Sequence, residues 1–205
     1  MTPSSEPMSV PYRQIRATYT DDTLRVYQAY SRSIADPAVC AGRLVAPFKR
    51  DRMTWIKPSF LWMMYRSGWA TKPGQEHVLA VDITRDGFEW ALGHASLSHF
   101  EAGTYADHAS WLARKAVTPV RIQWDPERDL ALAPMEHRAI QIGISGDAVR
   151  RYVDGWIVDI TDVTPTVREI AAQVSARNLD AARAALPDER PYPLANNIRR
   201  LIGAS

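Results

Sequence analysis

The sequence predicts a single α+β domain with a mixed or mostly antiparallel sheet flanked by helices. Segments with strand character are short and alternate polar with apolar residues, whereas the buried strands of a parallel sheet form continuous apolar runs. Helices of uneven length separate them, unlike the regular alternation of a doubly wound fold. The 205 residues, 46% of them hydrophobic and 23% charged, are enough for one domain with a core that needs no covalent staple.

The strand predictions rest on alternation and on β-branched or aromatic content. The clearest segment is HVLAVDIT, which is followed by a threonine-capped helix. Asp125 and Pro126 are expected to end the third strand. The predicted strands cover residues 12–18, 77–84, 119–124, 138–144 and 156–160.

Helices are predicted from capping residues and from apolar residues spaced three or four apart. The first follows Thr20, because Asp21 and Asp22 suit an N-cap and apolar side chains recur from Leu24 to Ile34. Gly68 is placed to end the third helix. The predicted helices cover about residues 22–33, 36–44, 58–67, 85–93, 105–115, 146–153, 164–174 and 179–186, with a short one in the tail.

Residues 47–76 form the stretch around which the chain is organised. Six basic and two acidic residues give it a net charge of +4, whereas the whole chain carries +2. Trp55, Trp62 and Trp69 recur every seven residues through it. Basic side chains interleaved with aromatic ones suit an anionic ligand that also carries a ring, so we predict the functional site here.

Lys57 and Pro58 precede the helix at residues 58–67, whose aromatic and methionine side chains are expected to be core. Free N–H groups at the helix start, the Ser59 hydroxyl and Lys57 together favour a phosphate. Lys57 and Arg66 bracket this apolar helix, so either acids elsewhere in the chain or a ligand must meet them. No glycine-rich phosphate loop occurs, which disfavours P-loop kinases and classical dinucleotide folds.

The candidate site residues fall into two groups. Glu76, Asp159 and Tyr27 are the catalytic candidates, with the alternative that the acids are ion-pair partners and the tyrosine is core. No metal site is expected, because the histidines match no compact ligand spacing. The ligand-binding candidates are Arg13, Arg16, Lys49, Arg52, Trp55, Lys57, Ser59 and Arg66.

Composition also bears on location. Residues 1–10 have no signal-peptide pattern and are expected to be a disordered lead-in to a globular domain at residues 11–205. No segment reaches the length and apolarity of a membrane helix, so no membrane partner is expected. A single cysteine, Cys40, excludes an internal disulfide framework and favours the cytoplasm.

Several motifs together resemble one family. They are RQIRATY, VYQAYSRSIADPAV, PFKRDRMTWIKPSFLWMMYRSGWATKPGQE, VLAVDITRDGFEWAL and GWIVDITDVT. The chain is similar over about residues 12–170 to the family called domain of unknown function 4291 (DUF4291). This resemblance implies a single domain and brings no activity with it.

Two classes of function remain from the sequence. The first is an enzyme acting on a nucleotide or nucleic-acid-like phosphate ligand, in its preferred version an NAD-dependent transferase of the ADP-ribosyltransferase type. Such enzymes are similar in size, in an early strand with a basic residue and in a tyrosine-bearing helix. The second is a non-catalytic module binding RNA or DNA. A structural alternative pairs the basic stretch with Asp82, Asp86 and Glu89. The oligomeric state is left open.

Overall fold

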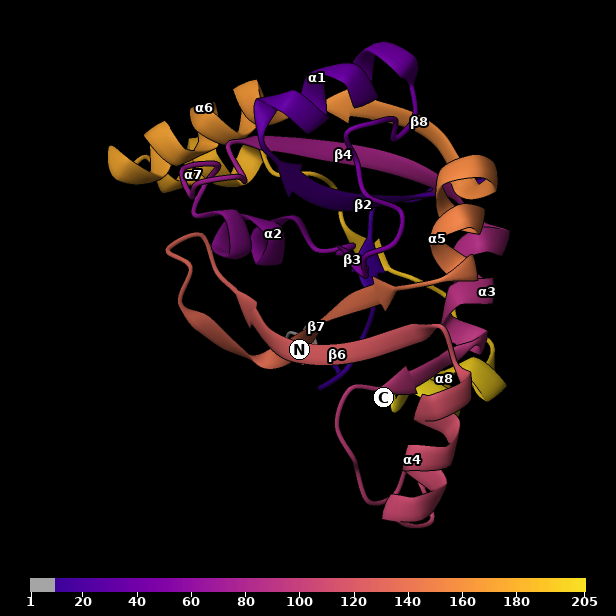
Figure 1. Ribbon diagram of the computed structural model, residues 1–205. Helices are drawn as coiled ribbons and strands as arrows, with labels where there is room; N and C mark the ends of the chain where they lie inside the picture. The colour runs from indigo at the N-terminus through magenta and orange to yellow at the C-terminus, as the bar shows by residue number, and fades with distance from the viewer. Residues whose placement is uncertain (1–9) are drawn as a thin grey trace, which may run out of the picture.

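The computed structural model of the protein describes residues 10–205 (Figure 1). The lead-in predicted for residues 1–10 lies, except for Val10, outside the described residues. The predicted class is confirmed, because helices surround sheets whose strands pair mainly antiparallel, with β5 and β6 parallel. The strands are β1 (Arg16–Ala17), β2 (Thr23–Tyr30), β3 (Thr54–Ile56), β4 (His77–Thr84), β5 (Ala95–Leu97), β6 (Val120–Arg128), β7 (Pro134–Ile144), β8 (Ile157–Asp162) and β9 (Arg190–Pro191).

Two sheets carry the fold. One has the order β2-β4-β8 and the other β3-β7-β6-β5, while β1 and β9 form a separate short pair. In the first sheet β2 pairs with β4 along its whole length, from Thr23 opposite Thr84 to Tyr30 opposite His77. Figure 1 shows the two sheets one above the other.

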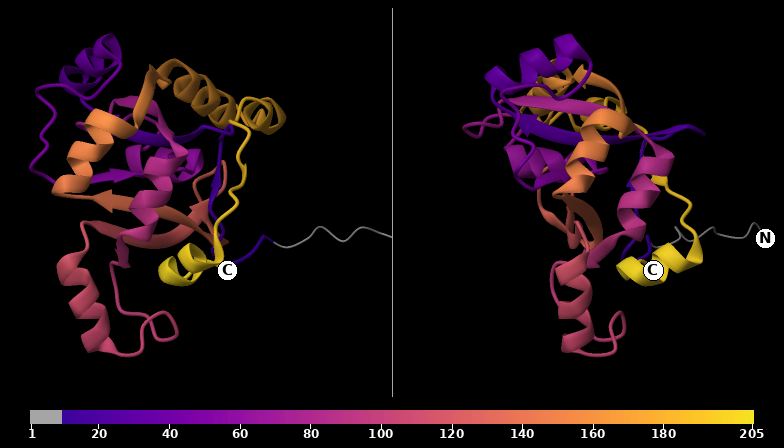
Figure 2. Two further views of the ribbon diagram at one scale, coloured as in Figure 1. Left: turned by 90° about the vertical axis from the view of Figure 1, so that its right-hand side faces the viewer. Right: turned by 45° about the vertical axis from the view of Figure 1, so that its right-hand side comes forward.

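The helices cover the outer faces and one side of this pair of sheets. In Figure 1 α1 and α6 lie above the β2-β4-β8 sheet, α7 lies beneath α6 at the left, and α5 and α3 lie on the right side of the molecule. Figure 2 shows α4 projecting below the second sheet. The helices are α1 (Arg32–Ala41), α2 (Phe60–Ser67), α3 (Arg85–Gly93), α4 (His108–Val117), α5 (Asp147–Arg151), α6 (Thr164–Ser175), α7 (Leu179–Ala184) and α8 (Asn196–Ile202), with a π-helical turn at Tyr152–Trp156.

Helix α2 lies between the two sheets, since it contacts both β2 and β6. Ser59 caps its start by accepting a hydrogen bond from the Trp62 N–H at 3.1 Å, and Gly68 ends it in the left-handed conformation. The expectation that this helix is core is confirmed for four of its side chains and is wrong for Tyr65, which is 37% exposed. The four buried side chains are Phe60, Trp62, Met63 and Met64. The helix therefore separates the sheets and leaves space beside it.

The helix predicted over residues 22–33 is wrong, because residues 23–30 form strand β2. TLRVYQAY also alternates, and eight residues paired with β4 outweigh the local capping signal of Asp21 and Asp22. Tyr27 is thus on a strand, which removes the tyrosine-bearing helix from the comparison with ADP-ribosyltransferases. The third predicted strand does not end at Asp125 but continues to Arg128 through an irregular pairing near Pro126. Within residues 10–205, no helix is both long and apolar enough to span a bilayer.

Candidate functional site

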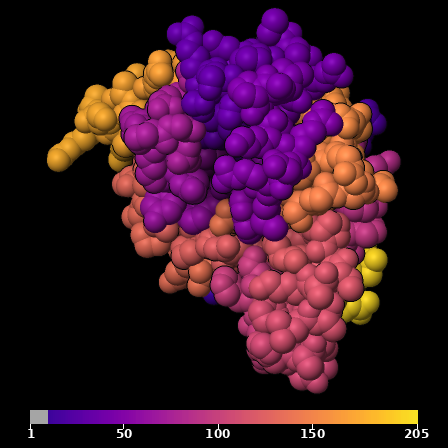
Figure 3. Space-filling view, in the orientation of Figure 1, coloured from indigo at the N-terminus to yellow at the C-terminus, as the bar shows by residue number. Residues whose placement is uncertain are grey.

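A cavity of about 490 Å³ opens beside α2, between the two sheets. This volume lies within the range of small-molecule sites. The lining is mostly polar and includes Lys57, Arg66 and the side chains of four glutamines, with no carboxylate among the lining residues. In Figure 3 a hollow lies between the segments around residues 45–55 and 60–76, above the strands of the second sheet. The cavity residues are Gln28, Ala29, Tyr30, Met53, Thr54, Trp55, Lys57, Met63, Arg66, Pro73, Gly74, Gln75, Gln123 and Gln141.

The backbone fixes the position of Lys57. Its carbonyl accepts the Tyr27 N–H at 2.7 Å, and its own N–H donates to the Tyr27 carbonyl at 3.3 Å, so Lys57 joins β3 to the edge strand β2. Pro58 follows and excludes a helical conformation at Lys57. The side chain is consequently held at the entrance to α2, with 4% of the residue exposed.

The Lys57 ammonium has no acidic partner. Among residues 10–205, no carboxylate lies within 4.0 Å of Nζ, whose hydrogen bond goes to the Trp55 carbonyl at 3.4 Å. Burial, and to a smaller extent the nearby charge of Arg66, lower the pKa of Lys57 to about 7 against the opposing effect of Asp125. Close to neutral pH this side chain is therefore present as both ammonium and amine.

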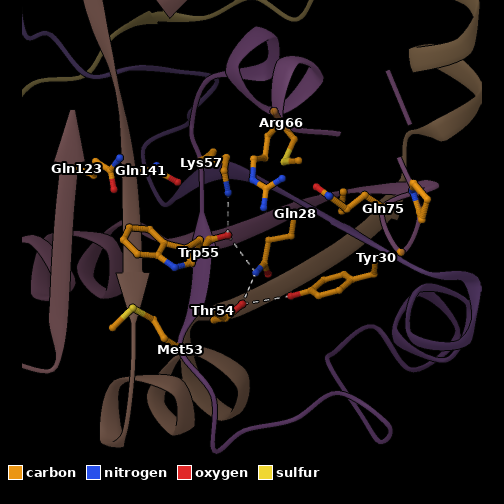
Figure 4. A pocket seen from close by; sticks show the side chains of 14 residues that line it. Gln28, Tyr30, Met53, Thr54, Trp55, Lys57, Arg66, Gln75, Gln123 and Gln141 are labelled. Carbon is orange, nitrogen blue, oxygen red and sulfur yellow. Dashed lines mark hydrogen bonds between the residues drawn. The ribbon is translucent and has the colours of Figure 1, made fainter. Parts of the chain in front are cut away.

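Arg66 shares the cavity with Lys57. Figure 4 shows its guanidinium pointing from α2 into the space between Lys57, Gln28 and Gln75. Like Lys57, it has no carboxylate within 4.0 Å in the described part of the chain. Arg66 is exposed to solvent, whereas Lys57 is buried, and a buried cation is normally compensated by an anion.

A buried hydrogen-bond network forms the wall beneath these cations. Gln28 Nε2 donates to Thr54 Oγ1 at 2.6 Å, and the Tyr152 hydroxyl donates to Gln28 Oε1 at 2.7 Å. The Tyr30 hydroxyl lies 3.3 Å from Thr54 Oγ1 (Figure 4). Because every member is satisfied, the network holds this wall rigid.

The opposite wall is the polar face of β6 and β7. Gln123 Nε2 donates to Asp125 Oδ1 at 2.9 Å, and Gln141 Nε2 donates to Asp125 Oδ2 at 2.7 Å. Asp125 thereby orients both amides by their nitrogens. The amide oxygens of Gln123 and Gln141 take no part in these bonds and are suited to accept hydrogen bonds from a ligand.

Trp55 supplies the aromatic surface of the cavity. A Cβ placed on Gly143, its partner across the β3–β7 pair, would lie 2.9 Å from the indole ring and 2.9 Å from Met53 Sδ. The glycine therefore lets the ring lie close against the sheet. Of the three evenly spaced tryptophans, Trp55 is the one in the cavity, while Trp69 packs on Phe60.

The start of α2 is occupied by an acid of the same chain. Glu189 Oε1 accepts the Phe60 N–H at 2.6 Å, and Ser59 is buried with its hydroxyl capping the helix. Burial raises the pKa of Glu189 to about 8, with a contribution from the neighbouring Glu127 carboxyl. The free N–H group expected to meet a phosphate thus meets this carboxyl group.

The remaining basic candidates lie in three other places. Lys49 and Arg52 line a second cavity beside the first. Arg16 donates to the Glu189 carbonyl at 3.0 Å. Arg13 forms an ion pair with Glu101 and also bonds to the Gly203 carbonyl at 3.3 Å, so it fastens the C-terminal segment.

The three catalytic candidates do not line the cavity. Glu76 follows the lining residue Gln75 and accepts the Gly74 N–H at 2.9 Å, and this hydrogen bond lowers its pKa. Asp159 is exposed on β8 and bonds to Thr161. Tyr27 is 2% exposed against Phe60, and burial keeps its hydroxyl protonated by raising the pKa.

Sequence reasoning missed the polar walls of the cavity. Gln28 lay in a segment interpreted as a helix, and Gln123 lay on a strand whose polar face was given no role. The alternation of PVRIQWDPER, with Gln123 and Asp125 on one face, was the available signal, since a polar face can line a cleft as well as meet solvent. Within residues 10–205, no cluster of three or more histidine, cysteine or acidic side chains is arranged to hold a metal.

The sequence profile of the family described as domain of unknown function (DUF4291) matches residues 14–192. The chain belongs to this family. No curated protein matches it. The cavity of this DUF4291 chain is built wholly from residues inside the matched range, from Gln28 to Gln141.

Proposed function

We propose that the protein is an enzyme acting on a nucleotide or nucleic-acid-like phosphate ligand, which it binds in the cavity between the two sheets. The observation that carries the proposal is the pair Lys57 and Arg66, two cationic side chains that face one cavity without a carboxylate partner in the described residues. A phosphate group would supply the missing negative charge and accept several hydrogen bonds at once.

The other lining residues suit the base and the ribose of a nucleotide. The Trp55 ring offers a face on which a base stacks, and such stacking contributes about 1–3 kcal/mol per base. The amide groups of Gln75, Gln123 and Gln141 offer donors and acceptors to ribose hydroxyls and base edges. A cavity lined with apolar groups alone would favour a different ligand class.

Lys57 is the side chain best placed to move a proton. Its pKa of about 7 is close to working pH, where a group exchanges protons most effectively. As an ammonium it binds phosphate, and as an amine it accepts a proton from an attacking hydroxyl. A bound anion favours the ammonium and raises this pKa, so ligand binding and the charge of Lys57 are coupled.

The NAD-dependent version requires a carboxylate to orient the ribose that reacts. Glu76 is the nearest candidate along the chain, since it follows the lining residue Gln75. NAD therefore stays in the set of ligands to be tested as a possible cofactor. The cytoplasm is the proposed location, on the cysteine content of the sequence.

A non-catalytic RNA- or DNA-binding module is the second candidate function. It is favoured by Lys49 and Arg52, which extend the positive charge from the cavity onto the surface. Binding by phosphate contacts alone weakens steeply with added salt.

The experiment is a binding and turnover assay of the purified protein with NAD, ATP, GTP and 5′-phosphorylated RNA at 50 mM and 200 mM salt. Calorimetry measures affinity, and chromatography separates products from substrates. Lys57→Met and Arg66→Gln remove the two charges and keep an unbranched aliphatic stem at each position. Lys115→Met is the matched control, because Lys115 is on α4 and contacts Trp111 and the Ser98 carbonyl.

The enzyme proposal is supported if the wild-type protein and Lys115→Met form product and Lys57→Met does not. If the protein binds only RNA, loses this binding at 200 mM salt and forms no product, the enzyme proposal is wrong and the binding module takes its place. If no nucleotide or RNA binds the wild-type protein, the proposal fails.

A further inference from the structure

A second cavity of about 320 Å³ adjoins the first. Tyr30, Met53 and Thr54 line both cavities, so one wall separates them. In Figure 4 these three side chains lie together at the lower edge of the first cavity. Met53, which is 39% exposed, therefore lies at the surface where the two cavities meet.

The second cavity is more apolar than the first but carries two cations. Phe48 and Tyr30 meet edge to face with ring centroids 6.1 Å apart, and Ile34 and Pro47 complete an apolar floor. Lys49 and Arg52 are exposed at its rim. An apolar floor beneath a cationic rim fits a ring attached to a phosphate.

Lys49 and Arg52, the two cations at this rim, have no side-chain hydrogen bond or ion pair within residues 10–205. Arg50, between them in sequence, pairs with Asp154 at 2.8 Å. Lys49 and Arg52 have no carboxylate within 4.0 Å among residues 10–205. The two rim cations therefore remain available to an anion, whereas their neighbour in sequence, Arg50, is already paired.

We propose that the two adjoining cavities bind one dinucleotide, with one nucleoside on each side of Met53 and the linking phosphates between Lys57 and Arg52. This inference rests on the proposed function and names its substrate class. Two nucleosides joined through phosphate occur in NAD, with a 5′–5′ pyrophosphate, and in RNA, with a 3′–5′ diester. The cavities distinguish a dinucleotide from a mononucleotide, since a mononucleotide fills only the first.

The test compares the dissociation constants of AMP, NAD and 5′-phosphorylated ApA for the wild-type protein by calorimetry at one salt concentration. At least one dinucleotide should bind about tenfold more tightly than AMP, which lies within the range that one additional stacked base contributes. The relative affinity of NAD and ApA identifies which linkage the site accepts.

A double substitution and a control variant test where the second nucleoside binds. Arg52→Ala and Lys49→Ala together should reduce the advantage of the dinucleotide over AMP to less than about threefold. Arg50→Ala is the matched control, because it removes a neighbouring exposed cation that is already paired, and it should keep the full advantage.

Equal affinities for AMP and both dinucleotides would overturn the inference and leave the proposed function intact. A dinucleotide advantage that survives the double substitution would also overturn it, because the second unit would then lie elsewhere. Failure of all three ligands to bind would overturn the inference and the proposed function together.

Discussion

Replacing Lys57 by methionine is expected to stabilise the folded protein at neutral pH. The pKa of Lys57 falls from 10.5 to about 7 on folding, chiefly through burial. At about 1.4 kcal/mol for each pH unit, this difference of about 3.5 corresponds to about 5 kcal/mol that opposes folding while the lysine is charged in the unfolded chain. We expect about 2 kcal/mol of it to be recovered, because methionine leaves Arg66 and the glutamines facing an apolar side chain.

The sign of this effect depends on pH. Between about pH 7 and 10.5 the unfolded chain holds the Lys57 proton and the folded protein does not, so wild-type stability gains from rising pH in that window. Lys57→Met lacks this gain. The stability advantage of the variant should therefore be largest at and below pH 7. It should vanish at about pH 9, where the wild type has gained about 2 kcal/mol, and it should be reversed at pH 10.

Chemical denaturation of both proteins at pH 6, 7, 8, 9 and 10 measures this difference directly, and the melting temperature at pH 7 should rise by about 5 °C. Lys115→Met controls for the general effect of losing a lysine. A loss of about 3–5 kcal/mol on Lys57→Met would refute the reasoning, because that is the signature of a broken buried ion pair.

Three further predictions follow from other contacts. Gly143→Val should displace Trp55, whose ring a Cβ would meet at 2.9 Å, and should lower stability by about 1–3 kcal/mol and weaken nucleotide binding in calorimetry. Tyr152→Phe should cost about 1–2 kcal/mol in denaturant unfolding, since Gln28 Oε1 loses its 2.7 Å donor while buried. Glu189→Gln should match the wild type in stability near pH 4.5 and exceed it increasingly up to pH 8, because the pKa of Glu189 is raised to about 8 and the unfolded chain loses that proton first. Denaturant unfolding of Glu189→Gln and of the wild type at pH 5 and at pH 8 checks this last prediction. A stability difference that is the same at both pH values would contradict it.

The fold class and most elements could be predicted from local pattern. Gly68 ends α2 and Thr84 caps α3 as predicted, because capping is a short-range interaction that the sequence displays. Strand β2 could not be predicted in this way. Its residues fit helical and extended spacing alike, and the choice was made by β4, which is far away in the sequence.

The sequence predicted the residues at the centre of the cavity but not those that form its walls. Lys57, Trp55 and Arg66 lie within one basic and aromatic stretch, so composition drew attention to them. Gln28 and Gln141 come from strands more than a hundred residues apart, and only the stacking of the two sheets brings them to one cavity. The same packing places Glu189 at the start of α2, where the sequence alone had suggested a ligand.

The pKa of Lys57, measured by nuclear magnetic resonance with and without a nucleotide, tests the central claim most directly. The chain has four lysines, so their side-chain signals can be assigned by substituting each in turn. We predict a pKa near 7 in the free protein and an increase of at least one pH unit when the cavity is saturated with NAD or ATP. A pKa near 10.5 in the free protein, or one that a saturating nucleotide leaves unchanged, would contradict the account.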